Sequence, residues 1–407
     1  MRFFYTIFIH LYNAGIAVAA LFNLKAKQLH RGRKQTWEIL ESACKDKKIV
    51  WFHAASLGEY EQGRPLIERL RQRHPELTFL VTFFSPSGYE VKKNAKEIDI
   101  ACYLPADTPR NVRRFLDIVH PQAAYFVKYE YWYNFIDGIT RRRIPLYYVS
   151  AIFRPSQYFF KPVGRWFARQ LQCCTHFFVQ DSRSAELLQS IGIKQVTITG
   201  DTRYDRVYAI AQQNARLDFV ESFKGDAQLL VVGSSWPHDE QAVAQVFPTL
   251  QRSYKLLLAP HLIDEGHITD ILARFSDYKT IRYTQREGHD LSEYQILIVD
   301  AIGLLSKIYR YADVAMVGGG FATGLHNTLE AAVFGIPVIF GPQYQKFAEA
   351  VGLVNRGGAF PVRNADELRE LMQRFENDPD FYRLTCQTCA AFVEENLGAC
   401  DKILENQ

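Results

Sequence analysis

Short apolar runs alternate with amphipathic stretches along most of the chain, a pattern that predicts strands alternating with helices. The first run, Ile49 to Ser56, precedes a helical stretch that ends in PLIERLRQRH, and Thr78 to Phe84 follows it. Further strands are predicted at 101–104, 123–127, 145–150, 175–180, 228–233, 255–260 and 295–299. Strands and helices that alternate in this way form parallel sheets, so the predicted fold class is α/β.

The predicted strands fall into two series, and the second begins after Gly200. A chain of 407 residues is also long enough for two domains that each bury a core. We therefore expect two α/β halves with a cleft between them. The expected divisions are a leading segment, an N-terminal domain, a C-terminal domain and a final helix, at 1–34, 35–205, 206–385 and 386–407.

The stretch Val314 to Pro342 combines an apolar strand, a glycine-rich loop at 318–324, a helix predicted from His326 to Phe334, and a second strand. Gly335 stands where a helix C-cap is expected. A glycine-rich turn that leads into a helix leaves N–H groups free for an anion such as a phosphate. The alternative is a plain strand–helix crossover that uses glycine for tight turning.

The N-terminal stretch from Phe3 to Phe22 is almost wholly apolar and has about the ~20 residues that a helix needs to cross a bilayer. The basic residues that follow it, Lys25 to Lys34, favour the cytoplasmic side. This pattern predicts an anchor that holds the body at the inner face of a membrane. A secretory signal and a helix lying in the interface are the alternatives.

Composition and charge exclude few classes. A net charge of +4 is too small to argue for nucleic acid. The seven cysteines include an adjacent pair but no C-x-x-C spacing, so we expect reduced thiols, with neither a zinc site nor a disulfide framework.

Two carboxylates of the N-terminal half follow predicted strands, where α/β proteins bind ligands. Glu59 stands at a helix start, but Ser56 to Glu59 also has the spacing of a capping box. Glu130 lies in the aromatic stretch FVKYEYWYNF, where surrounding rings can raise the pKa of a carboxyl or simply pack against it. Both residues are candidates for catalysis and for a structural role.

Further candidates lie at other predicted strand ends. Gly233, Ser234 and Ser235 form a second loop in the same half as the glycine-rich loop. His261 and the turn at 302–304 follow other strands of that half, and Arg203 lies at the domain junction. Each is equally compatible with ordinary turn chemistry. The triple arginine at 141–143 is expected to be a solvated face.

Taken in order, these segments resemble the Kdo (3-deoxy-D-manno-octulosonic acid) transferases of lipopolysaccharide synthesis, and most of all a Bacteroidetes-like branch of that family. The resemblance covers nearly the whole chain. It is carried by HAASLGEYEQGRPLIERL, SPSGYE, YLPADTPRNVRRFL, YFVKYEYWYNF, VSAIFRPSQ and TGDTRYD in the first half, and by GSSWPHDE, APHLIDE, VDAIGLL and GGGFATGLHNTLEAAVFGIPVIFGP in the second.

The resemblance implies a GT-B glycosyltransferase fold with two Rossmann-like domains, an acceptor-binding first domain, and a second domain that binds CMP-Kdo. It implies a lipid A precursor as acceptor, a general base at Glu59, and transition-state stabilisation by Glu130 and Arg203. The implied acceptor contacts are Ser56, Gly58 and Arg154. The implied donor contacts are Gly233, Ser234, Ser235, Pro260, His261, Ile302, Gly303, Leu304, Gly319, Gly320, His326, Asn327, Thr328, Leu329 and Glu330.

This sequence departs from the family pattern at several donor positions. Many members carry Arg where His261 stands, a basic residue near Asp264 and Glu265, and Lys at Thr323. Arg203 stands where Lys is common. Neutral His261 would be a weaker phosphate partner than Arg. We expect no metal in the transfer step and no cofactor beyond the CMP-Kdo donor, because no Asp-x-Asp motif stands at the proposed donor site.

Two rival functions remain at this stage. The same architecture serves UDP-sugar transferases and a UDP-sugar epimerase. A membrane-anchored nucleotide-sugar binding protein without turnover is the alternative outside enzymes. The expected partners are CMP-Kdo, the lipid acceptor and the inner-membrane surface, with no nucleic acid.

Overall fold

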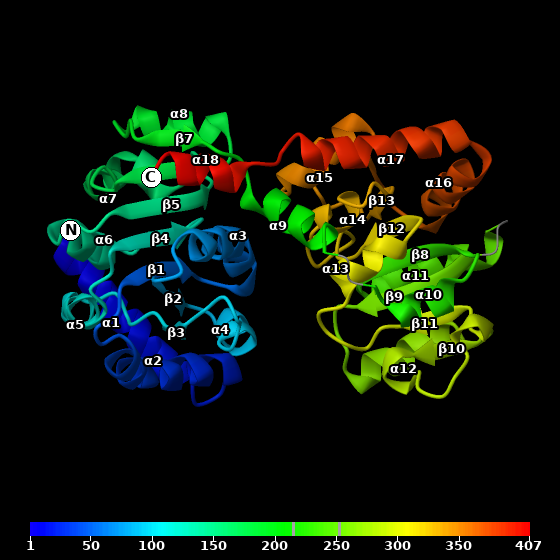
Figure 1. The fold of residues 1–407 in the computed structure, drawn as a ribbon, viewed down its shortest axis with the longest axis horizontal. Coiled ribbons are helices and arrows are strands. Elements are labelled where there is room, and N and C mark those ends of the chain that lie inside the picture. Colours follow the sequence, from blue (N-terminus) through cyan, green and yellow to red (C-terminus); the bar gives the residue numbers. More distant parts are fainter. Residues whose placement is uncertain (214–215, 251–253) are drawn as a thin grey trace. The chain divides into compact units, whose positions relative to one another are not determined.

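The computed structural model describes residues 1–213, 216–250 and 254–407, which form two compact units (Figure 1). Unit 1 comprises Met1–Arg206 and Leu397–Gln407, and unit 2 comprises Val207–Asn396. The boundary at Arg206 falls within helix α9, Thr202–Ala211. The segment 386–407, expected as one final helix, is divided between the end of α17 and a separate helix, α18.

Unit 1 contains a parallel sheet of seven strands in the order β3-β2-β1-β4-β5-β6-β7. Its strands are β1 Ile49–Ala54, β2 Thr78–Phe83, β3 Ile100–Tyr103, β4 Ala123–Val127, β5 Leu146–Ala151, β6 His176–Val179 and β7 Val196–Ile198. Its helices are α1 Arg2–Ala19, α2 Leu24–Ala43, α3 Leu57–Arg73, α4 Pro86–Lys92, α5 Pro109–Val119, α6 Tyr133–Arg141, α7 Arg165–Leu171, α8 Ser182–Ser190 and α18 Ala399–Glu405.

Unit 2 contains a second parallel sheet of seven strands, in the order β10-β11-β9-β8-β12-β13-β14. Its strands are β8 Gln228–Ser235, β9 Tyr254–Pro260, β10 Thr280–Arg282, β11 Ile296–Ile298, β12 Val314–Val317, β13 Val338–Phe340 and β14 Ala359–Pro361. Its helices are α10 Asp218–Lys224, α11 Pro237–Val246, α12 Glu265–Arg274, α13 Leu305–Ile308, α14 Leu329–Ala332, α15 Ala348–Arg356, α16 Ala365–Asn377 and α17 Pro379–Glu394.

The central strands are mostly apolar because helices cover both faces of each sheet, as expected for parallel sheets. In β1 every residue is buried, and successive side chains enter different clusters. Trp51 packs with Phe115 and Phe126 on one face, whereas Phe52 packs with Tyr125 on the other. The strand order around β1 is that of doubly wound folds, which bind ligands at the carboxyl ends of their strands.

The last helix, α18, belongs to unit 1. Cys400 and Ile403 enter the hydrophobic cluster on one face of the unit 1 sheet. The carboxylate of Asp205 accepts hydrogen bonds from the backbone N–H groups of Gly398 (2.8 Å) and Cys400 (2.7 Å), which fixes the start of the helix.

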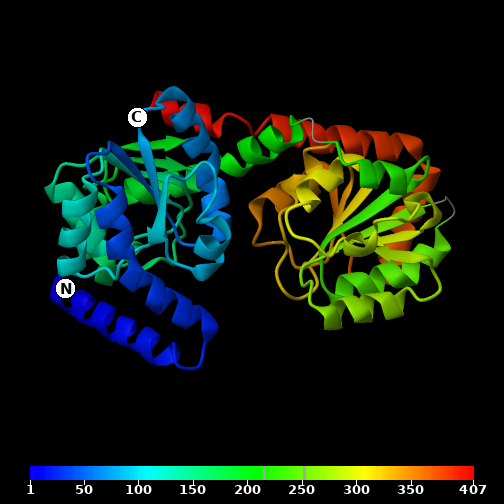
Figure 2. The ribbon, with the colours of Figure 1, turned by 60° about the horizontal axis from the view of Figure 1, so that its bottom comes forward.

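The N-terminal segment forms two helices, α1 and α2, that meet at a bend of 120° (Figure 2). The expectation of a single spanning anchor is not supported: among the described residues, no single helix is long and apolar enough to cross a membrane, and only the bent pair passes the test of length and composition together. Polar contacts tie α1 to unit 1, since the Tyr5 hydroxyl donates to Asp107 (2.7 Å) and Arg2 pairs with Asp137 (2.9 Å).

Candidate functional site

A buried imidazole and a carboxylate meet at the carboxyl ends of two adjacent strands of unit 1. His53 ends β1, fully buried, and Glu130 follows β4. Nε2 of His53 lies 2.9 Å from Oε2 of Glu130, and the indole N–H of Trp132 donates to the same oxygen at 2.7 Å. Nδ1 of His53 faces Thr82 on β2 at 2.9–3.0 Å. The Glu130 side chain is therefore held in one orientation.

Glu59 lies in the first turn of α3, close enough to Glu130 for their charges to interact. Burial is the main cause that raises the pKa of Glu59 above its ordinary range, and the charge of Glu130 adds to it. The carboxylate also accepts a hydrogen bond from the Ser56 backbone N–H at 2.9 Å, so the capping-box interaction is present. The cap interpretation of Glu59 is therefore confirmed, and its role in catalysis stays a prediction with which the raised pKa is compatible.

Tyr129 interacts electrostatically with Glu59, Arg154 and Arg203, so these candidates share one neighbourhood. The guanidinium of Arg154 lies 5.8 Å from the centre of the Tyr129 ring. Arg203 donates through Nε to Asp201 at 2.8 Å, and although burial of Asp201 opposes the effect, Arg203 lowers the pKa of that carboxyl. Part of the positive charge of Arg203 is thus already balanced within unit 1.

Two residues at this edge of the sheet adopt left-handed backbone conformations that side chains other than glycine seldom take. Lys128 follows β4 with φ 63°, and Ser150, near the end of β5, has φ 50°. The Ser150 hydroxyl lies 2.7 Å from that of Thr202. Backbone strain of this kind concentrates at functional sites, which agrees with the position of the carboxylates.

The expected acceptor contacts lie at the same edge. Ser56 is the N-cap of α3, Gly58 is exposed in the first turn of that helix, and Arg154 is exposed after β5. A Cβ atom at Gly58 would meet no other atom within 4 Å, so the side of α3 next to Glu59 is open.

Sequence reasoning missed His53, Trp132 and Asp201. His53 is the polar residue of the otherwise apolar strand IVWFHA, and a buried imidazole in such a strand needs partners at both ring nitrogens. That signal was available. The role of Asp201 depends on the turn before α9, which places its carboxylate within hydrogen-bond distance of Gln62 and Arg203. The residue types along the chain do not indicate this contact.

In unit 2, Gly233, Ser234 and Ser235 were expected to form a loop, but they are the last three residues of β8. A Cβ atom at Gly318, directly after β12, would come within 2.2 Å of the Ser234 carbonyl oxygen. Ser235 is buried and its hydroxyl donates to Glu240 at 2.9 Å. A Cβ at Gly233 would likewise meet Tyr309. Glycine at 233 and 318 therefore serves close packing of the backbone.

The backbone N–H of Gly319, expected to face a phosphate, has a partner inside the protein. It donates to Oδ2 of Asp239 at 3.0 Å, and the Trp236 N–H donates to the same oxygen at 2.9 Å. Burial raises the pKa of Asp239 to about 6, and its Oδ1 has no hydrogen-bond partner among the described residues. A carboxylate thus occupies the place expected for a ligand anion at this amide.

Three aromatic side chains stack beside this loop. Trp236 stacks on His261 with ring centroids 4.7 Å apart, and His261 lies 4.7 Å from His326. The Trp236 indole N–H donates to Nε2 of His326 at 3.2 Å. Burial lowers the pKa of both imidazoles, that of His326 to about 4 with a further contribution from His261. The stack therefore offers neutral rings at neutral pH.

A cavity of about 220 Å³ adjoins the stack and is lined by Trp236, Pro237, His238, Asp239, Gly319, Phe321, Ala322 and Thr323. Pro260 ends β9 and precedes His261. Gly320 lies against Gly341, so its backbone faces the protein interior. The turn Ile302, Gly303 and Leu304 follows β11; Ile302 is exposed and Gly303 has φ 90°.

The helix predicted from His326 to Phe334 is wrong in extent, because α14 comprises only Leu329–Ala332. His326 and Asn327 lie in the preceding loop, where the Asn327 amide donates to Glu330 at 3.1 Å. Thr328 is fully buried. The C-cap of α14 is Val333, so the C-cap expected at Gly335 is wrong; Gly335, with φ 65°, lies two residues further on in the turn. A single turn of helix gives little dipole to hold a phosphate.

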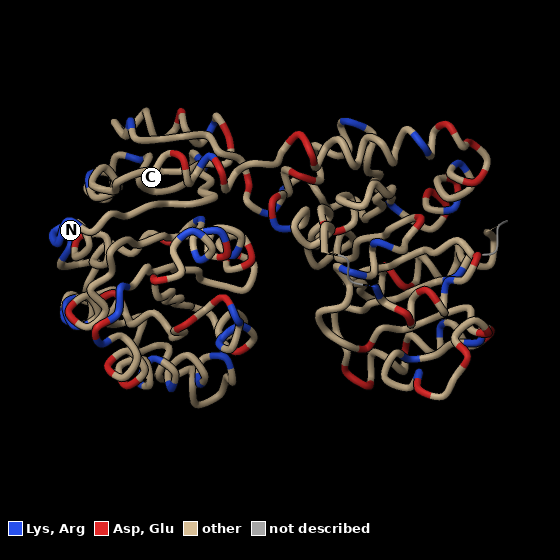
Figure 3. The backbone as a smooth tube through the Cα atoms, in the orientation of Figure 1, with Lys and Arg blue, Asp and Glu red and all other residues tan. Residues whose placement is uncertain are grey.

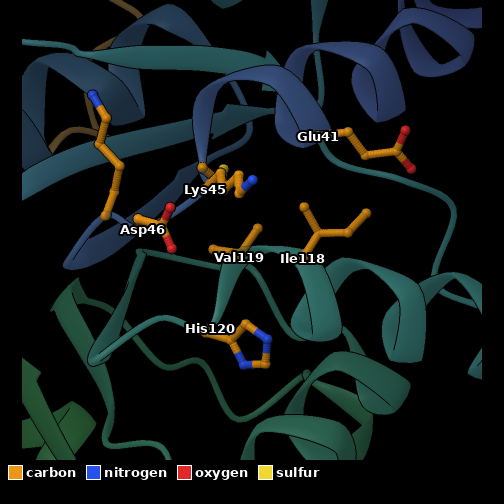
Figure 4. Close-up of a pocket in the computed structure, with 8 residues that line it drawn as sticks. Glu41, Lys45, Asp46, Ile118, Val119 and His120 are labelled. Atoms are coloured by element: carbon orange, nitrogen blue, oxygen red, sulfur yellow. The ribbon is translucent and has the colours of Figure 1, made fainter.

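Another cavity of unit 1 lies away from this site. It measures about 480 Å³ and is lined by Glu41, Cys44, Lys45, Asp46, Lys47, Ile118, Val119 and His120 (Figure 4). These residues precede β1 and β4, at the amino ends of the strands. The candidate carboxylates follow the same strands at the opposite ends, so this cavity is separate from them.

Comparison with known proteins gives one family over the first half. A family model described as 3-deoxy-D-manno-octulosonic-acid transferase matches residues 28–206. The chain is 28% identical over 334 residues to a 3-deoxy-D-manno-octulosonic acid transferase of Aquifex aeolicus, covering 81% of this chain and 86% of that protein. It is 25% identical over 417 residues to the enzyme so named from Haemophilus influenzae, covering 99% and 97%.

Solved structures share the fold at lower identity. The UDP-GlcNAc 2-epimerase of Neisseria meningitidis, solved with UDP-GlcNAc, matches with a TM-score of 0.63 and 14% identity, over 88% of this chain and 99% of that protein. This likeness shows the fold alone. Together with the two parallel sheets, it confirms the predicted GT-B fold of two α/β domains.

Proposed function

Because the chain belongs to the 3-deoxy-D-manno-octulosonic acid transferase family, we propose that it transfers Kdo from CMP-Kdo to a lipid A precursor, lipid IVA, in lipopolysaccharide biosynthesis. The observation that carries the proposal is the cluster of Glu59, Glu130 and His53. It lies within the segment that the family matches, at the ligand-binding edge of the unit 1 sheet.

In the proposed reaction Glu59 removes the proton from an acceptor hydroxyl as that oxygen attacks the anomeric carbon of Kdo. The C–O bond to CMP breaks, CMP leaves with the electron pair, and the proton remains on Glu59. One carboxylate base without a covalent intermediate inverts the anomeric centre. A raised pKa suits this role, because it makes Glu59 a stronger base than an exposed glutamate.

Glu130 and Arg203 complete the proposed catalytic group. A fixed carboxylate at Glu130 stabilises positive charge that develops on the sugar ring in an oxocarbenium-like transition state. The hydrogen bonds from Trp132 and His53 support this role, because they hold the carboxylate before the substrate arrives. Arg203 would counter the negative charge of the donor. No metal takes part in the proposal.

Unit 2 is the proposed donor-binding domain. Trp236 lines the cavity beside Gly319, and together with His261 and His326 it offers flat aromatic surface with ring nitrogens at its edge. We propose that the donor rests against this stack, and that its charge is met by backbone and neutral side-chain donors rather than by an arginine at position 261. The departure from the family pattern at His261 supports this assignment.

We further propose that the protein associates with the cytoplasmic face of the inner membrane through α1 and α2. The exposed face of α1 carries Phe3, Phe4 and Phe8. Lys and Arg positions follow along α2 (Figure 3). An apolar helix face followed by basic residues is typical of attachment to an anionic lipid surface.

The test is to incubate the purified full-length protein with CMP-Kdo and the lipid A precursor and to weigh the lipid product by mass spectrometry. A mass increase that matches added Kdo, with release of CMP, supports the proposal. Parallel reactions with UDP-GlcNAc test the epimerase and the UDP-sugar transferase. Binding of CMP without turnover of the lipid would favour a nucleotide-sugar binding protein.

A further inference from the structure

An aromatic strip connects the exposed face of α1 to the catalytic carboxylates of unit 1. Phe8 stacks with Tyr12 and Tyr12 with Phe84, each at 6.4 Å between ring centroids and 17° between planes. Phe84 stacks on Trp132 at 5.3 Å, and Trp132 donates to Glu130. The outer end of the strip is open, since Phe8 is 61% and Tyr12 44% exposed.

A cationic pocket lies beside the strip. Its volume is about 280 Å³, and its walls include Asn13 of α1, His30, Arg33 and Lys34 of α2, and Pro105 after β3. The guanidinium of Arg33 lies 5.2 Å from the centre of the Phe84 ring, so pocket and strip adjoin. These features follow neighbouring strands of the sheet. The pocket lies after β3, the strip passes Phe84 after β2, and the carboxylates lie after β1 and β4.

Arg33 is half-buried and has neutral partners. Its Nε donates to the Leu104 carbonyl and one terminal nitrogen donates to Asn13, both at 3.0 Å. Burial lowers the pKa of Arg33 to about 10. Within the described ranges, no carboxylate pairs with Arg33, His30 or Lys34. A half-buried cation without a counter-ion loses part of its hydration, and an anion such as a phosphate, which arginine binds bidentately, would offset that cost.

The surface around the pocket has the polarity of an amphipathic lipid. The exposed apolar residues Phe4, Leu11, Val18 and Phe22 continue along α1 and the turn after it. Apolar chains fit this face, a phosphate fits the pocket, and a sugar hydroxyl would lie toward Glu59. A free nucleotide or a soluble anion would leave the apolar face of α1 uncovered.

We propose that α1, Phe84 and the Arg33 pocket form the acceptor site, in which the pocket holds a phosphate of a glycolipid and the aromatic strip supports its apolar and sugar portions. The inference rests on the proposed function, and it assigns α1 to substrate binding in addition to membrane attachment. The acceptor, and not the bulk phospholipid, is the proposed occupant because the strip leads to the catalytic carboxylates.

The test compares two charge reversals on one face of α2. Lys34 lines the pocket, whereas Lys27 is exposed two turns earlier and lies outside it. Each full-length variant is assayed with CMP-Kdo and either the phosphorylated lipid A precursor or the same lipid after phosphatase treatment. Flotation with phosphatidylglycerol–phosphatidylcholine vesicles measures membrane attachment. Tyr12→Ala tests the strip in the same assay.

Lys34→Glu should raise the KM for the phosphorylated acceptor about tenfold or more, with the donor KM unchanged and little effect on the dephosphorylated lipid. Lys27→Glu should change the acceptor KM little, and Tyr12→Ala should raise it for both lipids. An unchanged donor KM also shows that the variants are folded.

Equal effects of Lys34→Glu and Lys27→Glu, together with equal loss of vesicle binding, would assign the charge to the bulk membrane and overturn the proposal. An effect of Lys34→Glu that is the same for both lipids, or absent for both, would overturn it as well. Failure of the proposed function is a different result, because then the wild-type protein would transfer Kdo to neither lipid.

Discussion

Nε2 of His53 lies 2.9 Å from Oε2 of Glu130, and the imidazole is fully buried between β2 and β4. Loss of this contact would leave the Glu130 carboxylate with Trp132 as its described side-chain donor. The pair therefore connects the apolar core of unit 1 to its carboxylate site, and in the proposed reaction we expect His53 to be a positioning residue that acts through Glu130.

Replacement of His53 should separate this role from simple packing. His53→Leu removes the donor to Glu130 and should lower kcat about 10–100-fold, the effect of one hydrogen bond to a charged group. His53→Gln keeps an N–H near the Nε2 position and should recover part of that loss. Steady-state kinetics with saturating donor provides the measurement. Equal activity of the two variants per folded molecule would assign His53 to packing alone.

Glu59→Gln tests the base directly. The amide keeps an oxygen that can accept the Ser56 N–H, so the start of α3 should remain capped. Transfer should nevertheless fall by about 10²–10⁴-fold, the usual contribution of a general base. Thermal unfolding measured beside the rate distinguishes the two roles. A variant that is less stable but retains its rate per folded molecule would show that Glu59 serves only as a cap.

Glu130 should control the pH at which Glu59 ionises. The rate should fall as pH decreases through the raised pKa of Glu59, because the base must be deprotonated. Glu130→Gln removes the neighbouring charge, which should lower that pKa and move the acid limb of the pH–rate profile to lower pH. The readout is the midpoint of the limb, which does not depend on how much kcat itself falls. A limb that stays in place would mean that burial alone sets the pKa.

Asp239 and His326 should give unit 2 opposite dependences of stability on pH. Between pH 3.8 and about 6 the unfolded state loses the Asp239 proton while the folded state keeps it, so stability should fall as pH rises. Asp239→Asn should remove this slope and stabilise the protein above pH 6 by an amount on the order of 2–3 kcal/mol.

For His326 the sign is reversed. Its pKa is lowered from 6.5 to about 4, so between these values the unfolded state gains a proton first, and stability should fall as pH decreases. Because the two contributions oppose each other over the same pH range, His326→Asn should leave the Asp239 slope, with stability falling as pH rises, whereas Asp239→Asn should leave the His326 slope. The ¹⁹F signal of 5-fluorotryptophan at position 236, which contacts both residues, can follow the unfolding of unit 2. Slopes of the same sign for both variants would contradict these assignments.

Much of the fold follows from local pattern. The apolar runs at 49–54, 78–83 and 123–127 are wholly or nearly wholly buried strands, and they alternate with helices as predicted. Such strands can be recognised in the sequence because parallel strands are covered on both faces and are therefore apolar along their length. Helix lengths were harder to predict. The helix α14 begins only at Leu329, because the residues before it form a loop. In that loop the His326 N–H donates to the Gly318 carbonyl.

The candidate site was only partly predictable, for a physical reason. Glu59 and Glu130 were found because each follows an apolar strand, which places both at one edge of the sheet. The partners that orient them come from other strands and turns, and pairing of this kind depends on tertiary structure. Asp239 shows why such pairing is hard to predict: its carboxylate accepts a hydrogen bond from the Gly319 N–H of the glycine-rich loop, eighty residues away in sequence. The sequence pattern alone is compatible with a phosphate site and with a plain strand–helix crossover.

Tyr5 should show whether α1 is an integral part of unit 1. Its hydroxyl donates to Asp107, which is buried and whose pKa burial raises to about 6. Tyr5→Phe leaves the ring contacts with Tyr133 and Trp166 but removes a donor from a buried carboxylate, so it should destabilise unit 1 by about 1–3 kcal/mol. Tyr12→Phe is the matched control on the same helix, because Tyr12 is 44% exposed and no buried carboxylate accepts from its hydroxyl among the described residues.

Chemical denaturation of both variants at pH 7.5, where Asp107 is ionised, gives the comparison. The difference between them should shrink as pH falls below about 6, because a protonated Asp107 no longer needs the Tyr5 donor as strongly. If Tyr5→Phe were as stable as Tyr12→Phe at every pH, α1 would be an appendage whose removal leaves the body intact. A clear loss for Tyr5→Phe would mean that truncating the N-terminus to remove the apolar segment also damages the domain that holds the carboxylates.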